Sequence, residues 1–83
     1  MAEQKLLKLT ISRVNGPVFD GDVISVSVPG VDGDMQILAQ HEALLSPLRT
    51  GVISVERSDK TLESFDIDSG TLEISHNHAT ILI

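Results

Sequence analysis

The sequence predicts an all-β protein, a two-sheet β-sandwich of about ten short strands. Apolar and polar side chains alternate along most of its 83 residues, and a period of two is typical of half-buried strands. Turn-forming residues interrupt this alternation at short, even intervals, as in sandwiches and barrels. A single sheet would leave one apolar face in water, so we expect two sheets packed face to face. The length, without linker, repeat or low-complexity tract, predicts one domain over residues 1–83.

The predicted strands are rich in Val, Ile and Thr, which favour a pleated, half-buried surface. Within each strand we expect the alternate apolar residues to face the core. In chain order these residues are Leu7, Leu9 and Ile11; Ile24, Val26 and Val28; Gly51, Ile53 and Val55; Phe65 and Ile67; Leu72 and Ile74; and Ala79, Ile81 and Ile83.

Clusters of Gly, Asn, Asp, Pro and Ser separate these strands and predict turns. The clusters are residues 15–17, 20–22, 29–30, 32–34, 58–60, 69–70 and 76–78. Two of them, Asp20-Gly21-Asp22 and Asp32-Gly33-Asp34, also suggest calcium ligands. Both lack the remaining ligand positions and the closing Glu of an EF-hand loop, so we interpret them as tight turns.

Residues 35–48 allow two interpretations. Their apolar residues could form a short helix that ends before Pro47, because proline disfavours the helical conformation of the residue before it. The polar run Gln40-His41-Glu42 interrupts the apolar pattern in the middle. We therefore predict two short strands around a bend.

The composition disfavours several classes of function. Six basic against twelve acidic residues give a net charge of −6, unsuited to phosphate backbones. With two Phe and no Trp or Tyr, the chain lacks a platform for stacking bases. No apolar run exceeds three residues, so we expect a soluble domain without membrane insertion.

Candidate chemistry is sparse. His76-x-His78 could begin a metal site, but zinc needs three or four ligands and no partner is obvious, so we predict a turn there. Neither a Gly-x-Ser-x-Gly elbow nor a phosphate-binding loop is present. We predict a protein that is not an enzyme, with no catalytic residue, cofactor, metal or small-molecule substrate. For His41 two interpretations stay open: a cap on the bend, or a contact with a partner.

The motifs of residues 6–83, taken in order, carry a resemblance to a known family. They are Leu9-x-Ile11; Pro17-Val18-Phe19-Asp20-Gly21-Asp22-Val23; Val26-x-Val28-Pro29-Gly30; Gly33-Asp34-x-x-Ile37-Leu38-x-x-His41-x-Ala43-Leu44-Leu45-Ser46; Leu48-x-x-Gly51-x-Ile53-x-Val55; and Gly70-x-Leu72-Glu73-Ile74-x-x-Asn77-x-Ala79-x-Ile81-Leu82. This order resembles the N-terminal β-sandwich domain of the ε subunit of F-type ATP synthases, called δ in mitochondria.

The resemblance implies a non-catalytic subunit of the central stalk, or rotor. Such a subunit binds the γ subunit and the membrane c-ring, and so couples ion-driven rotation to ATP synthesis in the catalytic head. It would lie peripherally at the cytoplasmic face of the inner (plasma) membrane. By position, the c-ring contact would comprise Val31, Asp32, Gly33, Asp34, Met35 and Gln36, and the γ contact Arg13, His41, Ala43, Leu44, Leu45 and Ser46. An acid such as Asp34 suits c-ring loops that carry basic residues.

Departures from the family pattern accompany this resemblance. Ala39-Gln40 stands where the family usually has Pro-Gly, and Ala43 stands where Pro is common. The sequence stops at Ile83, whereas family members usually continue into a C-terminal helical hairpin. We expect either a naturally short form, weakly favoured by Met1, or a piece of a longer chain. Without the hairpin it would neither inhibit ATPase activity by that route nor bind ATP there. The alternative function is an unrelated β-sandwich interaction module or adaptor.

Overall fold

The computed structural model describes residues 5–83, which form eight strands and no helix, and therefore no helix that could cross a membrane. The predicted domain, 1–83, also includes residues 1–4, which lie outside the described part. The strands are β1 (Leu7–Arg13), β2 (Gly16–Gly30), β3 (Gly33–Leu38), β4 (Leu44–Leu48), β5 (Gly51–Arg57), β6 (Leu62–Ile67), β7 (Gly70–Ser75) and β8 (His78–Leu82).

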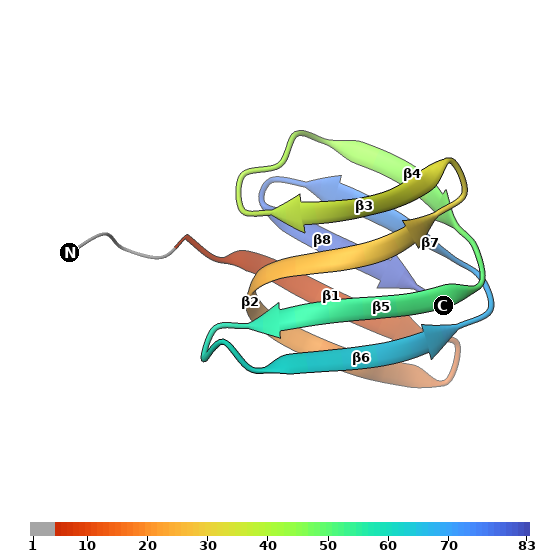
Figure 1. Cartoon of the computed structure of the whole chain (residues 1–83), viewed down its shortest axis with the longest axis horizontal. Coiled ribbons are helices and arrows are strands. Elements are labelled where there is room, and N and C mark those ends of the chain that lie inside the picture. The colour runs from red at the N-terminus through yellow and green to blue at the C-terminus, as the bar shows by residue number, and fades with distance from the viewer. Residues whose placement is uncertain (1–4) are drawn as a thin grey trace.

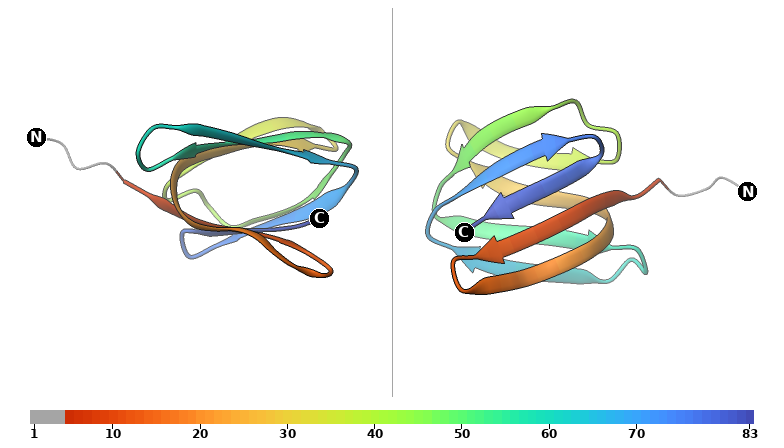
Figure 2. Two further views of the ribbon diagram at one scale, coloured as in Figure 1. Left: turned by 90° about the horizontal axis from the view of Figure 1, so that it is seen from below. Right: turned by 180° about the vertical axis from the view of Figure 1, so that it is seen from behind.

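The strands form two layers that face each other (Figures 1 and 2). One layer contains β3, the second half of β2, β5 and β6, and the other contains the first half of β2, then β1, β8, β7 and β4. The β1–β8 pair is parallel, and the other pairs are antiparallel. The long strand β2 belongs to both layers. The predicted all-β sandwich is confirmed.

A core of aliphatic side chains fills the space between the layers. Its buried members are Leu7, Leu9, Ile11, Val23, Val26, Val28, Ile37, Leu48, Ile53, Val55, Ile67, Leu72, Ile74, Ala79 and Ile81. Phe19 and Phe65 pack against this core. Their two rings meet edge to face, with centroids 6.2 Å apart. Because Phe19 lies on β2 and Phe65 on β6, this pair joins the two layers where those strands approach.

The structure has eight strands, whereas the sequence predicted about ten. One reason for the difference is that residues 16–30 form a single strand. The predicted turn at Asp20-Gly21-Asp22 is wrong: these residues run inside β2, and Gly21 pairs with Leu9 of β1. The predicted turn at Pro29-Gly30 is also displaced, since both residues still pair with β3 and the chain turns at residues 31–32. Pairing with β1 and β3 keeps this segment extended despite its turn-forming residues, because tertiary context overrides local preference.

A β-bulge changes the core face of β2. Val23 pairs with Arg57, but Ser25 pairs with Glu56, so Ile24 is an extra residue. An extra residue shifts the inward and outward alternation by one position. As a result, Val23 and Val26 are both buried, whereas Ile24 is only half-buried and outside the core cluster. The prediction that Ile24 faces the core in register with Val26 is wrong.

Residues 35–48 form two strands around a bend, as predicted. β3 ends at Leu38, β4 begins at Leu44, and Pro47 lies inside β4. The bend includes Gln40, whose φ of 64° is in the left-handed region. β4 pairs with β7 along its length, and its pairing with β2 is limited to Leu48 with Gly30. The bend therefore carries the chain from one layer to the other.

Candidate interaction surface

The predicted c-ring residues lie on the β2–β3 hairpin. Gly30 pairs with Gly33, which leaves a two-residue turn, Val31-Asp32, at the tip. Gly33 has a φ of 136°, a conformation that side chains other than glycine rarely adopt. The main-chain N–H of Val31 donates to the carbonyl of Pro47 at 3.1 Å, so the tip is attached to β4. Val31 is 54% exposed and Asp32 is exposed.

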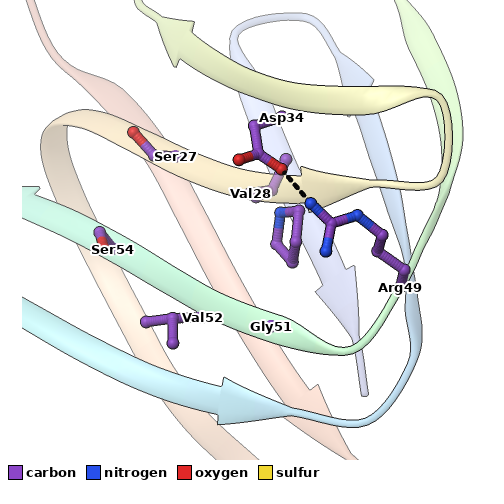
Figure 3. Close-up of a pocket in the computed structure, with 8 residues that line it drawn as sticks. Ser27, Val28, Asp34, Arg49, Gly51, Val52 and Ser54 are labelled. Atoms are coloured by element: carbon purple, nitrogen blue, oxygen red, sulfur yellow. Dashed lines mark hydrogen bonds and ion pairs between the residues drawn. The ribbon is translucent and has the colours of Figure 1, made fainter.

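Asp34 forms an ion pair that the sequence did not reveal. Its Oδ1 accepts a hydrogen bond from Arg49 Nη2 at 2.8 Å, with side chains 74% and 52% exposed respectively (Figure 3). Both residues border a hollow of about 320 Å³ over the outer face of β2 and β5. An exposed pair of this kind contributes about 0–1 kcal/mol. Since fifteen positions separate the two residues, only the strand pairing brings them together.

The loop 39–43 carries His41. The His41 Nδ1 lies 2.8 Å from the carbonyl oxygen of Glu42, so the ring nitrogen donates to it. This is the bond expected of a cap on the bend. The neighbouring Gln40 donates its main-chain N–H to Asn77 Oδ1 at 2.8 Å. The sequence assigned Asn77 only to a turn, and its contact with a loop 37 positions away was missed.

β4 presents an apolar side chain to solvent. Leu45 pairs with Glu73 of β7, and it is 70% exposed. On one side lies a shallow hollow of about 340 Å³ between β4 and β7. On the other lies a groove of about 320 Å³ that reaches the β2–β3 hairpin. Leu45 lines both hollows.

The groove brings the two predicted contact sets together. Its walls are residues 32–35 of the predicted c-ring contact and residues 44–46 of the predicted γ contact, with Pro47 beside them. Arg13 does not join them: it pairs with Gly16 at the end of β1, whereas loop 39–43 lies beside Leu6 and Asn77 at the beginning of β1. The seven residues of β1 place these two ends about 20 Å apart.

Of the two histidines near the C-terminus, His76 lies in a turn, as predicted, whereas His78 is the first residue of β8. His76 and Asn77 have φ values of 51° and 58° and form the two-residue loop between β7 and β8. The His76 ring contacts Ser75 Oγ, and His78 Nε2 lies 3.0 Å from Thr10 Oγ1. Within residues 5–83, no three His, Cys, Asp or Glu side chains are grouped as metal ligands.

Comparisons with known proteins point to one family. The family described as "ATP synthase, Delta/Epsilon chain, beta-sandwich domain" matches residues 6–83. The ATP synthase epsilon chain of Sulfurimonas denitrificans is 38% identical over 77 residues, 93% of this chain and 59% of that protein. The epsilon chain of Nitratiruptor sp. is 44% identical, over 93% of this chain and 60% of that protein. The epsilon chain of Chlorobium limicola is 40% identical over 81 residues, 98% of this chain and 92% of that protein.

Solved structures share the fold. A chain of the Euglena gracilis mitochondrial ATP synthase (OSCP/F1/c-ring) superposes with a TM-score of 0.86 at 20% identity, over 99% of this chain and 52% of that one. A chain of the Tetrahymena thermophila mitochondrial ATP synthase (central stalk/c-ring) gives 0.77 at 13% identity, over 98% and 65%. The present chain spans about 60% of the length of the Sulfurimonas and Nitratiruptor proteins. By its sequence match and its fold, the chain belongs to the family of ATP synthase δ/ε chain β-sandwich domains.

Proposed function

We propose that the chain is a central-stalk subunit of an F-type ATP synthase, which binds the γ subunit and the c-ring. The observation that carries this proposal is the family match over residues 6–83. In this role the chain performs no catalysis and uses no cofactor, because ATP chemistry belongs to the catalytic head. As part of the complex, it lies peripherally at the cytoplasmic face of the membrane. The family match removes the alternative of an unrelated β-sandwich adaptor.

The surface around Leu45 supports a protein contact on the γ side. An apolar side chain that is 70% exposed between two hollows offers a neighbouring protein apolar area that can be buried on binding. His41, Ala43, Leu44 and Ser46 lie along the same stretch, between the loop and β4. The γ contact of Arg13 stays a separate prediction, since that residue lies at the other end of β1.

The β2–β3 hairpin supports a polar contact on the c-ring side. Its tip exposes Asp32, which makes no ion pair within residues 5–83, and beside it Asp34 is shared with Arg49. Carboxylates at a rim attract basic loops and set their register. Because the hairpin and β4 share a groove, the two partners would meet at adjacent surfaces of one stiff sandwich. This arrangement suits a part that transmits rotation.

Recovery of partners with the tagged chain from membranes of its source cell tests the proposal. We expect the wild-type chain to recover both γ and the c-ring. Leu45→Ser should recover about tenfold less γ, because it removes the apolar area that the Leu45 side chain would bury against γ. Asp34→Asn should recover less c-ring, with an effect that weakens at high salt because charge contacts are screened. Both variants should keep the fold, since both side chains are exposed.

Leu62→Ser is the matched control. Leu62 is 78% exposed, but it lies on β6, away from the groove. It should recover γ and the c-ring as the wild type does. Equal recovery by Leu45→Ser and Leu62→Ser would contradict the assignment of the γ contact. A wild-type chain that recovers neither partner would contradict the proposed function itself.

A further inference from the structure

We propose that Asn77 is a positioning residue, whose side-chain amide holds loop 39–43 in the shape that the γ subunit binds. This inference rests on the proposed function and deepens it. Asn77 lies in the β7–β8 turn, 37 positions from the loop that it holds.

The Asn77 side chain joins two segments that are far apart in the sequence. Its Oδ1 accepts the main-chain N–H of Gln40 at 2.8 Å. Its Nδ2 donates to the carbonyl of Leu6 at 2.9 Å, in a partly buried bond. The amide therefore uses both its acceptor and a donor, and attaches the loop to the residue before β1 as well as to its own turn.

Gln40 requires such support. Its φ of 64° is uncommon for a residue with a long side chain. A residue held there carries strain, and it persists only where the surroundings fix it. The bond from Asn77 ends on the N–H of this strained residue. Since His41 follows Gln40 and the chain then enters β4, the bond sets the course of the chain into the predicted γ contact.

Asparagine is well suited to this turn, but the turn does not require its side chain. Asn77 has a φ of 58° in a two-residue hairpin loop, and glycine adopts that conformation more readily than any other residue. If position 77 served only the turn, glycine would serve as well. Only a side chain with both an acceptor and a donor makes the bonds to Gln40 and Leu6.

Hydrogen exchange of the variants Asn77→Gly and Asn77→Asp tests whether the side-chain bonds of Asn77 hold the loop. Asn77→Gly keeps the turn but removes both side-chain bonds, so the Gln40 amide should exchange about tenfold faster, as expected for one lost hydrogen bond. Asn77→Asp keeps an acceptor for Gln40 but loses the donor to Leu6, so the Gln40 amide should exchange more slowly than in Asn77→Gly. The Lys8 amide is the internal control, because it donates at 3.2 Å to the main-chain oxygen of Asn77, which every variant retains.

Binding to purified γ subunit supplies the second measurement. We expect Asn77→Gly to bind several-fold more weakly than the wild type, and Asn77→Asp, which keeps the bond to Gln40, to bind more tightly than Asn77→Gly. Unchanged exchange at Gln40 in Asn77→Gly would overturn the inference, as would equal acceleration at Gln40 and Lys8, which would indicate loss of the whole turn. Faster exchange at Gln40 with unchanged γ binding would overturn the positioning role. If the wild-type chain does not bind γ, the proposed function fails, whatever the exchange pattern shows.

Discussion

At the scale of single residues, the turns depend on side chains that bond to the main chain. Outside glycine, a positive φ occurs within residues 5–83 only at Gln40, Lys60, His76 and Asn77. Asn77 supports Gln40 across the molecule. Near Lys60, the Asp59 carboxylate accepts from both the N–H and the hydroxyl of Thr61, at 3.0 and 2.6 Å. A local side-chain bond of this type stabilises a turn that the backbone alone would leave open.

The Asp59 turn predicts a pH dependence. Two hydrogen bonds from Thr61 lower the pKa of the Asp59 carboxyl below 3.8. The bond from the hydroxyl has the larger effect, and the bond from the main-chain N–H comes second. Because the folded pKa lies below the unfolded value, the bonds stabilise the fold above pH 3.8, and this contribution is lost as the pH falls through the folded pKa. Thr61→Val removes the hydroxyl and should raise the pKa of Asp59 towards 3.8. Carboxyl NMR titration of both proteins is the measurement, and a wild-type pKa at or above 3.8 would contradict it.

At the scale of the elements, β2 organises the fold. Its first half pairs with β1 and its second half with β3 and β5, so one strand joins the two layers. The bulge at Ile24 lies where the strand passes from one layer to the other. A bulge bends and twists a strand, which allows its apolar residues to face the same core before and after the bend.

The bulge predicts unequal costs for one substitution at two positions. Ile53→Val removes a methyl group from a fully buried residue and should lower the free energy of unfolding by about 0.5–1.5 kcal/mol. Ile24→Val removes the same group from the half-buried bulge residue, and it should cost about 0.5 kcal/mol or less. Urea unfolding of both variants gives the comparison. Equal costs would mean that Ile24 belongs to the core after all.

At the scale of the whole molecule, close backbone contacts determine how the layers join. The chain leaves β6 and enters β7 in the other layer at Gly70 (Figure 1). A Cβ atom added at Gly70 would lie 2.6 Å from the carbonyl oxygen of Leu82 and 2.9 Å from Ile83 Cγ2. A side chain at position 70 would therefore force residues 82–83 to shift.

Gly70→Ala tests this crossing, with Gly21→Ala as its matched control. We expect Gly70→Ala to destabilise the fold by about 1–3 kcal/mol, because the methyl group overlaps main-chain atoms. At Gly21 the added Cβ would meet only the Phe19 ring, at 3.8 Å, so Gly21→Ala should be neutral or stabilising by up to about 1 kcal/mol. Thermal unfolding measures both, and a neutral Gly70→Ala would show that residues 82–83 move aside at little cost.

Alternation and motif order in the sequence were enough to predict the fold class, most of the core and the family. The alternation in Leu7, Leu9 and Ile11 or in Leu72 and Ile74 identified the buried face, because a strand has a fixed period of two. The same rule failed at Ile24, where a bulge breaks the period and no local signal marks it. Asp20-Gly21-Asp22 has the composition of a turn, but pairing with β1 extends it.

The way the candidate surface is assembled could not be predicted before the strand pairing was known. The order of the motifs placed Asp34 and Leu45 in two separate contacts, yet the hairpin and β4 join them along one groove. The pairs Asp34–Arg49 and Asn77–Gln40 connect positions 15 and 37 apart. Local sequence encodes which residues lie in strands and turns, whereas contacts over such separations depend on strand register and on how the two layers meet.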